Sequence, residues 1–155
     1  MRRTRLITTA LLMLCAGASA ADDNHVPVHE KSGATLYVAG QIEGYGSTEF
    51  LIDTGASYLA INADMLKVLE RGGHARFLRR LTGHMADGRR RSVPIYRISG
   101  IVIGDNCVLS DVEAAVLPGN TRNILGLSAL RRTAPFTLSM DPPALSLSGC
   151  EKPQA

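Results

Sequence analysis

The tripeptide Asp53-Thr54-Gly55 places a carboxylate, a hydroxyl and a glycine directly after three large apolar residues, 50–52. A lone carboxylate is costly to bury unless it is paired, hydrogen-bonded or protonated. One interpretation is an Asx-type turn, in which Asp53 accepts hydrogen bonds from nearby backbone N–H groups and Gly55 relaxes the backbone. The other interpretation is acid catalysis, which needs more than one carboxylate.

Two close carboxylates can hydrolyse a peptide bond without a metal or a covalent nucleophile. One takes a proton from water while the other directs a proton to the carbonyl, and their repulsion keeps one proton shared. The sequence holds one Asp-Thr-Gly and no Asp-Ser-Gly. Two other aspartates do not supply a second copy of the motif, because Asp87 is followed directly by glycine and Asp141 by two prolines. A carboxylate pair would therefore take Asp53 from two chains related by a two-fold axis.

Apolar and polar residues alternate over several short stretches, which is the period of half-buried strands. A helix is predicted after Asn62, a favourable N-cap, and it ends near Arg71. Asp87-Gly88 predicts a hairpin turn, and Pro94 argues that the second arm is not a central, fully paired strand. The predicted strands lie at residues 35–42, 48–52 and 58–61, in the two hairpin arms, twice within 101–119, and at 136–140 and 144–148.

Three stretches in this order carry a family resemblance: "LIDTGAS", "NILGLSAL" and "FTLSMDPPALSLS". The chain resembles the retropepsin-like aspartic proteases, both the single-domain retroviral enzymes and their exported bacterial relatives, over residues 35–147. The resemblance implies a mostly β, single-domain acid protease barrel with one or two short helices. It also implies an aspartic endopeptidase that is a homodimer, acts on a polypeptide substrate and uses no cofactor.

The resemblance assigns roles to the loop at residues 53–57. Asp53 would hold and activate the water, Thr54 would hydrogen-bond across the dimer axis, and Gly55 would let its backbone approach the carboxylate closely. Ala56 stands where pepsin-like enzymes commonly have serine, which predicts a pH optimum less acidic than pepsin's. Ser57 completes the loop and has no obvious neighbouring base, so a serine nucleophile is not expected.

The resemblance also supplies a substrate groove and a flap. Ile124 and Leu125 would line the groove, and Gly126 would let the chain cross behind the active-site loop. The flap would close over the peptide and exclude water, although it lacks the clustered glycines of retroviral flaps. Its predicted residues are Met85, Ala86, Asp87, Gly88 and Arg89.

The run Arg89-Arg90-Arg91 is not part of the family pattern. A solvated hairpin arm explains it most simply. A preference for acidic substrate side chains and a processing site are the two alternatives, and the sequence leaves all three open.

Residues 1–20 have the pattern of a signal peptide: arginines at the start, an apolar run over 6–14, and Ala18-Ser19-Ala20 before the cleavage point. This predicts export to the periplasm or the medium. The apolar run is short for a membrane span, so no stable span is expected after cleavage. Leu14 precedes Cys15, where a lipid-anchored protein needs a small residue, which argues against an anchor.

The expected organisation is a signal peptide at 1–20, a polar arm at 21–34, a protease domain at 35–150 and a loose tail at 151–155. Removal of residues 1–20 takes three arginines away and leaves 14 basic and 14 acidic residues. The sequence pI of 9.0 is therefore largely due to the leader. The mature chain has no overall basic character, and no nucleic-acid partner is expected.

Cys107 and Cys150 would remain after cleavage, and in an oxidising compartment they form either one intrachain disulfide, an intermolecular bond or two separate thiols. His25 and His29 are separated by Pro27, which disfavours a helix that would place both on one metal. No metal site is expected. The sequence also has no phosphate-binding loop, dinucleotide fingerprint or Gly-x-Ser-x-Gly element.

Two other classes of function remain open on the sequence alone. One is a non-catalytic peptide-binding or interaction module of the cell envelope that keeps the retropepsin fold. The other is a small structural protein in which Asp53-Thr54-Gly55 is only a turn. The intact tripeptide argues against the first, because a binding module has little physical need for that acid.

Overall fold

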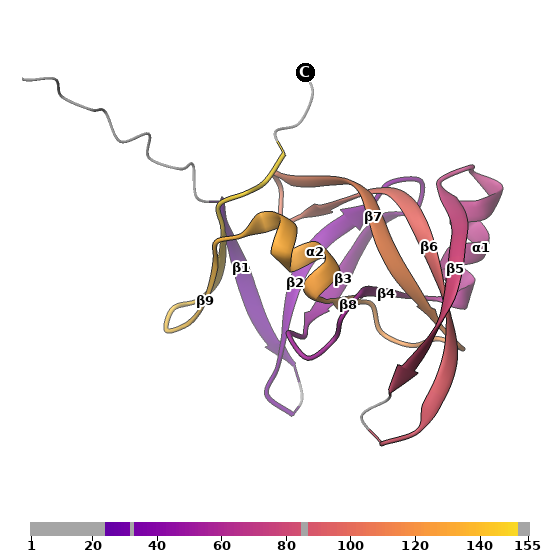
Figure 1. Ribbon diagram of the computed structural model, residues 1–155. Coiled ribbons are helices and arrows are strands. Elements are labelled where there is room, and N and C mark those ends of the chain that lie inside the picture. Colours follow the sequence, from indigo (N-terminus) through magenta and orange to yellow (C-terminus); the bar gives the residue numbers. More distant parts are fainter. Residues whose placement is uncertain (1–23, 32, 85–86, 152–155) are drawn as a thin grey trace, which may run out of the picture.

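The computed structural model describes residues 24–31, 33–84 and 87–151 (Figure 1). The predicted signal peptide, with Cys15, lies outside the described residues. Among the described residues, no helix has the length and apolar character needed to cross a membrane. The elements in chain order are β1 Asn24–Lys31, β2 Thr35–Ile42, β3 Gly46–Ile52, β4 Leu59–Asn62, α1 Ala63–Arg71, β5 Ala75–His84, β6 Arg90–Ile103, β7 Cys107–Leu117, β8 Ile124–Leu125, α2 Leu127–Leu130, the 3-10 turn Arg131–Thr133, β9 Phe136–Met140 and β10 Pro143–Leu147.

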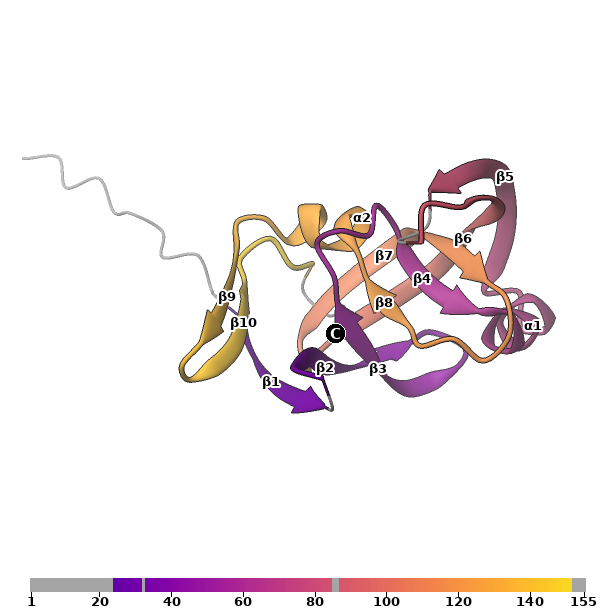
Figure 2. The ribbon, with the colours of Figure 1, turned by 90° about the horizontal axis from the view of Figure 1, so that it is seen from below.

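The described strands form one sheet that closes on itself. The strand order is β5-β6-β7-β4-β8-β3-β2-β1-β10-β9, and β6 also pairs with β2. This extra pairing runs from Gly40↔Ile103 to Ile42↔Ile101. It closes the strands β6-β7-β4-β8-β3-β2 into a ring. The result is a small barrel with the β9–β10 hairpin beside it, as Figure 2 shows. The predicted mostly β barrel with short helices is confirmed.

Alternating side chains fill the barrel interior. The fully buried residues come from nearly every strand, and they include Val38, Phe50, Leu59, Ile98 and Leu109. Closing the barrel removes these apolar side chains from water, which is the main favourable term in folding. The same packing fixes the end of β3, from which the loop that carries Asp53 starts.

The predicted helix is confirmed as α1. The side chain of Asn62 accepts a hydrogen bond of 2.8 Å from the Met65 N–H, which satisfies one of the free donors at the helix start. Met65, Leu66 and Leu69 form the buried side of the helix. Arg71 lies in the last turn, where a cation is favourable.

The N-terminal segment corrects the expectation of a polar arm at residues 21–34. Within that stretch, Asn24–Lys31 forms β1, which pairs first with β10 and then with β2. Val26 and Val28 are buried in the core. The segment is therefore an integral strand, in which the buried Val26 and Val28 alternate with His25, Pro27 and His29 on the outer face.

The C-terminal end is fixed by covalent and polar contacts. Cys107 at the start of β7 forms a disulfide with Cys150. Glu151 accepts hydrogen bonds from Arg132 at 2.5 Å and from the Ser110 hydroxyl at 2.8 Å. This corrects the start of the expected loose tail, since Glu151 is held against β7; residues 152–155 lie outside the described residues.

The β5–β6 hairpin extends beyond the barrel (Figure 1). Its register brings His84 opposite Arg90, with the turn between them at the predicted place. Pro94 pairs with Arg80 of β5, whereas pairing with β7 begins only at Ile95. The prediction from Pro94 therefore applies to the outer half of β6 and is wrong for the inner half, which is paired on both sides.

Candidate active site

Asp53 lies at the end of β3, on the loop that leads into β4. β3 runs parallel to β8, and the Asp53 N–H donates to the Leu125 carbonyl at 3.2 Å. The carboxylate Oδ1 accepts a hydrogen bond of 2.8 Å from the Gly55 N–H. This is the contact that an Asx-type turn requires, and it also fixes the direction of the carboxylate. The side chain is half-buried.

Gly55 is matched to this geometry. A Cβ at this position would lie 3.1 Å from Asp53 Oδ1, a contact tighter than most side chains make. Thr54 and Gly55 are both exposed. The bond of Thr54 across a dimer axis stays a prediction.

Gly126 lies directly behind the loop. A Cβ at this position would be 2.1 Å from the Tyr58 carbonyl oxygen and 2.8 Å from the Ala56 carbonyl oxygen. The following residue, Leu127, donates its N–H to the same Ala56 carbonyl at 2.8 Å. The absence of a side chain thus allows the close crossing that the resemblance implies for Gly126.

Ser128 is a positioning residue that the sequence analysis missed. Its N–H donates to the Ser57 carbonyl at 3.0 Å, and its hydroxyl accepts from the Leu59 N–H at 2.8 Å. The same hydroxyl donates to the Glu113 carbonyl at 3.0 Å. Ser128 therefore ties the end of the loop to β7. The nearest sequence signal is its place in "NILGLSAL", two residues after Gly126.

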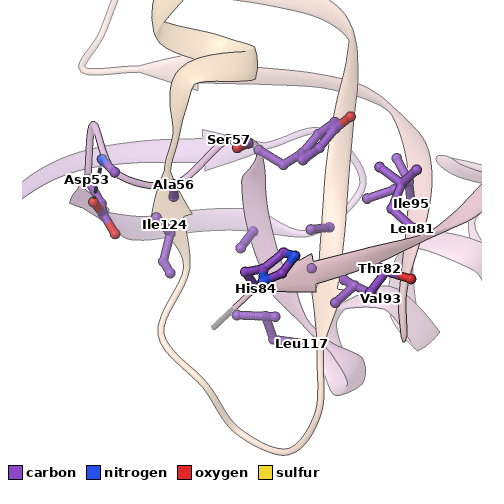
Figure 3. Close-up of a pocket in the computed structure, with 15 residues that line it drawn as sticks. Asp53, Ala56, Ser57, Leu81, Thr82, His84, Val93, Ile95, Leu117 and Ile124 are labelled. Atoms are coloured by element: carbon purple, nitrogen blue, oxygen red, sulfur yellow. Dashed lines mark hydrogen bonds between the residues drawn. The ribbon is translucent and has the colours of Figure 1, made fainter. Parts of the chain in front are cut away.

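A cleft of about 710 Å³ opens beside Asp53 (Figure 3). One side comes from the loop and β8, and the facing wall comes from the β5–β6 hairpin and β7. The wall is largely apolar, which suits an extended polypeptide segment. The residues that line the cleft are Asp53, Gly55, Ala56, Ser57, Tyr58, Ala60, Leu81, Thr82, Gly83, His84, Val93, Ile95, Ala115, Leu117 and Ile124.

The two predicted groove residues, Ile124 and Leu125, lie in different surroundings. Ile124 lines the cleft, but Leu125 is fully buried and belongs to the core. The correction follows from strand geometry, because successive side chains of β8 point to opposite faces. The hairpin residues Leu81, Val93 and Ile95 form the wall instead, and their alternation in the two arms was the available signal.

The predicted flap lies only partly within the described residues. Met85 and Ala86 fall outside them. Asp87, Gly88 and Arg89 form the turn, where Asp87 Oδ1 accepts from the Arg89 N–H at 2.9 Å and Gly88 has a φ of +78°. These three residues lie outside the lining of the cleft, to which the hairpin contributes through Leu81–His84, Val93 and Ile95.

An ion pair connects the hairpin wall to β7. Arg79 donates to both carboxylate oxygens of Glu113, at 3.1 and 2.7 Å, and to the Tyr58 hydroxyl at 3.3 Å. Hydrogen bonding from Arg79 holds the pKa of Glu113 below its usual value, against the opposing effect of burial. The same pair raises the pKa of Arg79. Tyr58, which lines the cleft, is thereby fixed from outside it.

The four histidines contact different neighbours, although His25 and His29 share β1. His25 contacts the Ser146 hydroxyl, His29 lies 2.8 Å from a Glu49 carboxylate oxygen, and His74 contacts Ser99. His84 lies in the cleft. The described residues contain no group of three or more His, Cys, Asp or Glu side chains placed to hold a metal ion.

Comparisons with known proteins show similarity in both sequence and fold. The model of the family described as gag-polyprotein putative aspartyl protease matches residues 38–132, a range that includes both Asp53 and Gly126. A search of solved structures finds similarity to a retropepsin-like aspartic protease from Rickettsia conorii. The TM-score is 0.57 at 16% sequence identity, covering 84% of this chain and 95% of the other. A comparison with curated proteins found no match.

Proposed function

Because the chain belongs to the retropepsin-like aspartic protease family, we propose that it is an aspartic endopeptidase whose active form is a homodimer. The observation that carries the proposal is the position of Asp53. Its carboxylate lies at the edge of a largely apolar cleft, and the Gly55 N–H fixes one of its oxygens. A peptide in the cleft would meet an oriented acid.

The proposed chemistry needs two copies of Asp53. With one proton shared between the two carboxylates, the ionised one takes a proton from the attacking water. The protonated one donates toward the scissile carbonyl oxygen. The sequence has no second Asp-Thr-Gly, so the partner is Asp53 of another chain. Thr54, exposed beside the acid, is the residue proposed to brace the two loops against each other.

Ala56 bears on the pH of the reaction. A serine at this position would offer a hydroxyl to the ionised acid and would favour the charged form, whereas alanine offers none. The proposed enzyme therefore works at a less acidic pH than pepsin. The proposed location is outside the cytoplasm, supported by the leader pattern and by the Cys107–Cys150 disulfide.

The test compares the purified protein with Asp53→Asn on an unfolded protein substrate between about pH 4 and pH 7. Asp105→Asn, which changes an exposed acid in the β6–β7 turn, is the matched control. Cleavage by the native protein and by Asp105→Asn, with at least a hundredfold loss in Asp53→Asn, is expected. Equal cleavage by Asp53→Asn would refute the catalytic role.

The dimer is tested separately by dilution. If the active species holds one Asp53 from each chain, specific activity falls as the protein is diluted below its dimer dissociation constant. Sedimentation velocity on the same samples measures the fraction of dimer. Full specific activity in samples that contain only monomer would contradict the shared site.

A further inference from the structure

Charge is divided unevenly between the β5–β6 hairpin and the rest of the chain. Residues 75–103 contain seven arginines and one acidic residue, Asp87. Residues 21–74 and 104–155 together contain 7 basic and 13 acidic residues. The net charge of the mature chain is near zero, yet the hairpin is strongly positive. A concentration of one sign on one element creates a local potential that attracts opposite charge.

Several of these arginines have no counter-charge within the described residues. Arg79 and Arg97 share Glu113, and Arg89 lies 3.5 Å from Asp87. Arg80 donates to the Ser92 hydroxyl at 3.0 Å, which leaves its charge uncompensated. The side chains of the exposed Arg76, Arg90 and Arg91 make no hydrogen bond or ion pair with the other described residues. The excess charge is therefore available to a partner.

The free charge lies next to the cleft. Val93 and Ile95 line it, and side chains two residues apart on a strand share a face, so Arg91 lies on the cleft side of β6. Its partner in the register is Gly83, which also lines the cleft and has no side chain to cover Arg91. Arg90 leaves the strand on the opposite face from Arg91. It is exposed and pairs in the register with His84, which also lines the cleft. Figure 3 shows the wall that Val93 and Ile95 form, facing Ile124 and Asp53.

We propose that Arg90 and Arg91 give this cleft a preference for polypeptide segments with acidic side chains beside an apolar stretch. The proposal rests on the proposed peptidase function and names its substrate class. The apolar wall accepts the apolar part of the segment, and the guanidinium groups at its outer end bind Asp or Glu side chains. A polypeptide fits better than a flat anionic surface, because Arg91 shares the face of β6 whose residues Val93 and Ile95 line a cleft.

Binding to the full chain that carries Asp53→Asn tests the proposal independently of catalysis. Three labelled peptides share an apolar centre and differ only at the flanking positions, which hold Glu, Gln or Lys. Fluorescence anisotropy at low salt gives a dissociation constant for each. The Glu peptide is expected to bind about fivefold more tightly than the Gln peptide. The difference should shrink at about 0.5 M salt, because exposed charges are then screened.

Two double variants in the same Asp53→Asn background locate the effect. Arg90→Gln with Arg91→Gln should bring the Glu-to-Gln ratio of dissociation constants close to one. Lys67→Gln with Arg71→Gln removes two positive charges from α1 and should leave the ratio as it was. Circular dichroism verifies that each variant is folded.

Three results would overturn the proposal: no preference for the Glu peptide, the same ratio in the hairpin variant, or an equal loss in the α1 variant. Failure to bind any of the peptides would do the same. Anionic phospholipid vesicles are added as a competitor of the Glu peptide. If they displace it when the concentration of lipid charges is lower than that of peptide charges, the arginines bind a membrane surface instead. Cleavage assays with the native protein report separately on the proposed function, so the two can fail independently.

Discussion

Arg79 and Glu113 connect the hairpin wall to β7 through two hydrogen bonds, from the guanidinium Nη1 and Nη2 to the two carboxylate oxygens at 3.1 and 2.7 Å. Nη2 also donates to the hydroxyl of Tyr58. The backbone carbonyl of Glu113 accepts from Ser128, whose hydroxyl holds the Leu59 N–H. One series of contacts therefore runs from β5 to the end of the loop that carries Asp53.

Glu113→Gln tests how much this ion pair contributes to stability. The folded-state pKa of Glu113 is lowered, chiefly by hydrogen bonding from Arg79. The ionised carboxylate therefore stabilises the fold above its unfolded pKa of about 4.3, and this contribution is lost as the pH falls through the folded pKa. At pH 7 the variant should melt about 3 °C lower than the native protein. At about pH 3 the two melting temperatures should converge.

Thermal melting followed by circular dichroism at both pH values measures this difference. Glu30→Gln removes an exposed carboxylate of β1 and serves as the control. Its melting temperature should stay close to that of the native protein at pH 7. A loss in Glu113→Gln that is equally large at both pH values would show that packing, and not charge, is responsible.

The disulfide carries a second prediction. Cys107 and Cys150 are separated by 43 positions, and the bridge restricts the unfolded chain over that loop. On the chain-entropy model, Cys107→Ala with Cys150→Ala should lower the free energy of unfolding by about 4 kcal/mol. Denaturant titration measures it. A reducing agent should destabilise the native protein by a similar amount and leave the double variant unchanged; a native protein insensitive to reduction would contradict the prediction.

Local sequence signals were sufficient for the helix and for the loop. Asn62 as N-cap and the apolar spacing after it predict α1, since both act within one or two turns. The apolar run before Asp53 likewise predicts the end of β3. The two strands that flank the Asp87 turn follow from their alternation and the turn residues alone.

Long-range pairing decided the features that the sequence did not reveal. β1 was expected as an arm because its polar residues are as prominent as its valines, yet β2 and β10 lie on either side of it and bury Val26 and Val28. Ser128 is 69 positions from Leu59, and Arg79 is 34 positions from Glu113. Such contacts depend on barrel closure, which no local pattern encodes. Leu125 is different, because strand alternation already implied that it and Ile124 face opposite ways.

Asn62 supports two elements at once and gives a third prediction. Its Oδ1 accepts from the Met65 N–H at 2.8 Å, and its Nδ2 donates to the Thr121 carbonyl at 3.2 Å. Asn62→Ala removes both contacts and should lower the free energy of unfolding by about 2 kcal/mol. Asn62→Ser keeps an uncharged capping oxygen and loses the contact with Thr121, so its cost should be smaller. Denaturant titration of both variants would refute this account if Ser were as costly as Ala.

Gly126 gives a fourth prediction, which tests whether glycine is needed there for space behind the Asp53 loop or for backbone flexibility. Its φ of −96° is open to any residue, so the need for glycine is purely steric. In Gly126→Ala the new Cβ would lie 2.1 Å from the Tyr58 carbonyl oxygen, and the loop that carries Asp53 must shift. We expect a loss of about 2 kcal/mol in stability and at least a tenfold loss in peptide cleavage.

Gly119→Ala is the matched control for Gly126→Ala, because its Cβ meets open space and only its φ of +69° is unfavourable. It should cost about 1 kcal/mol in stability and leave cleavage at its native rate. Melting curves and initial cleavage rates on both variants make the comparison. If Gly126→Ala cleaves as fast as Gly119→Ala, the close crossing behind the loop does not position Asp53, and the loop must be held by its contacts to Leu127 and Ser128 alone.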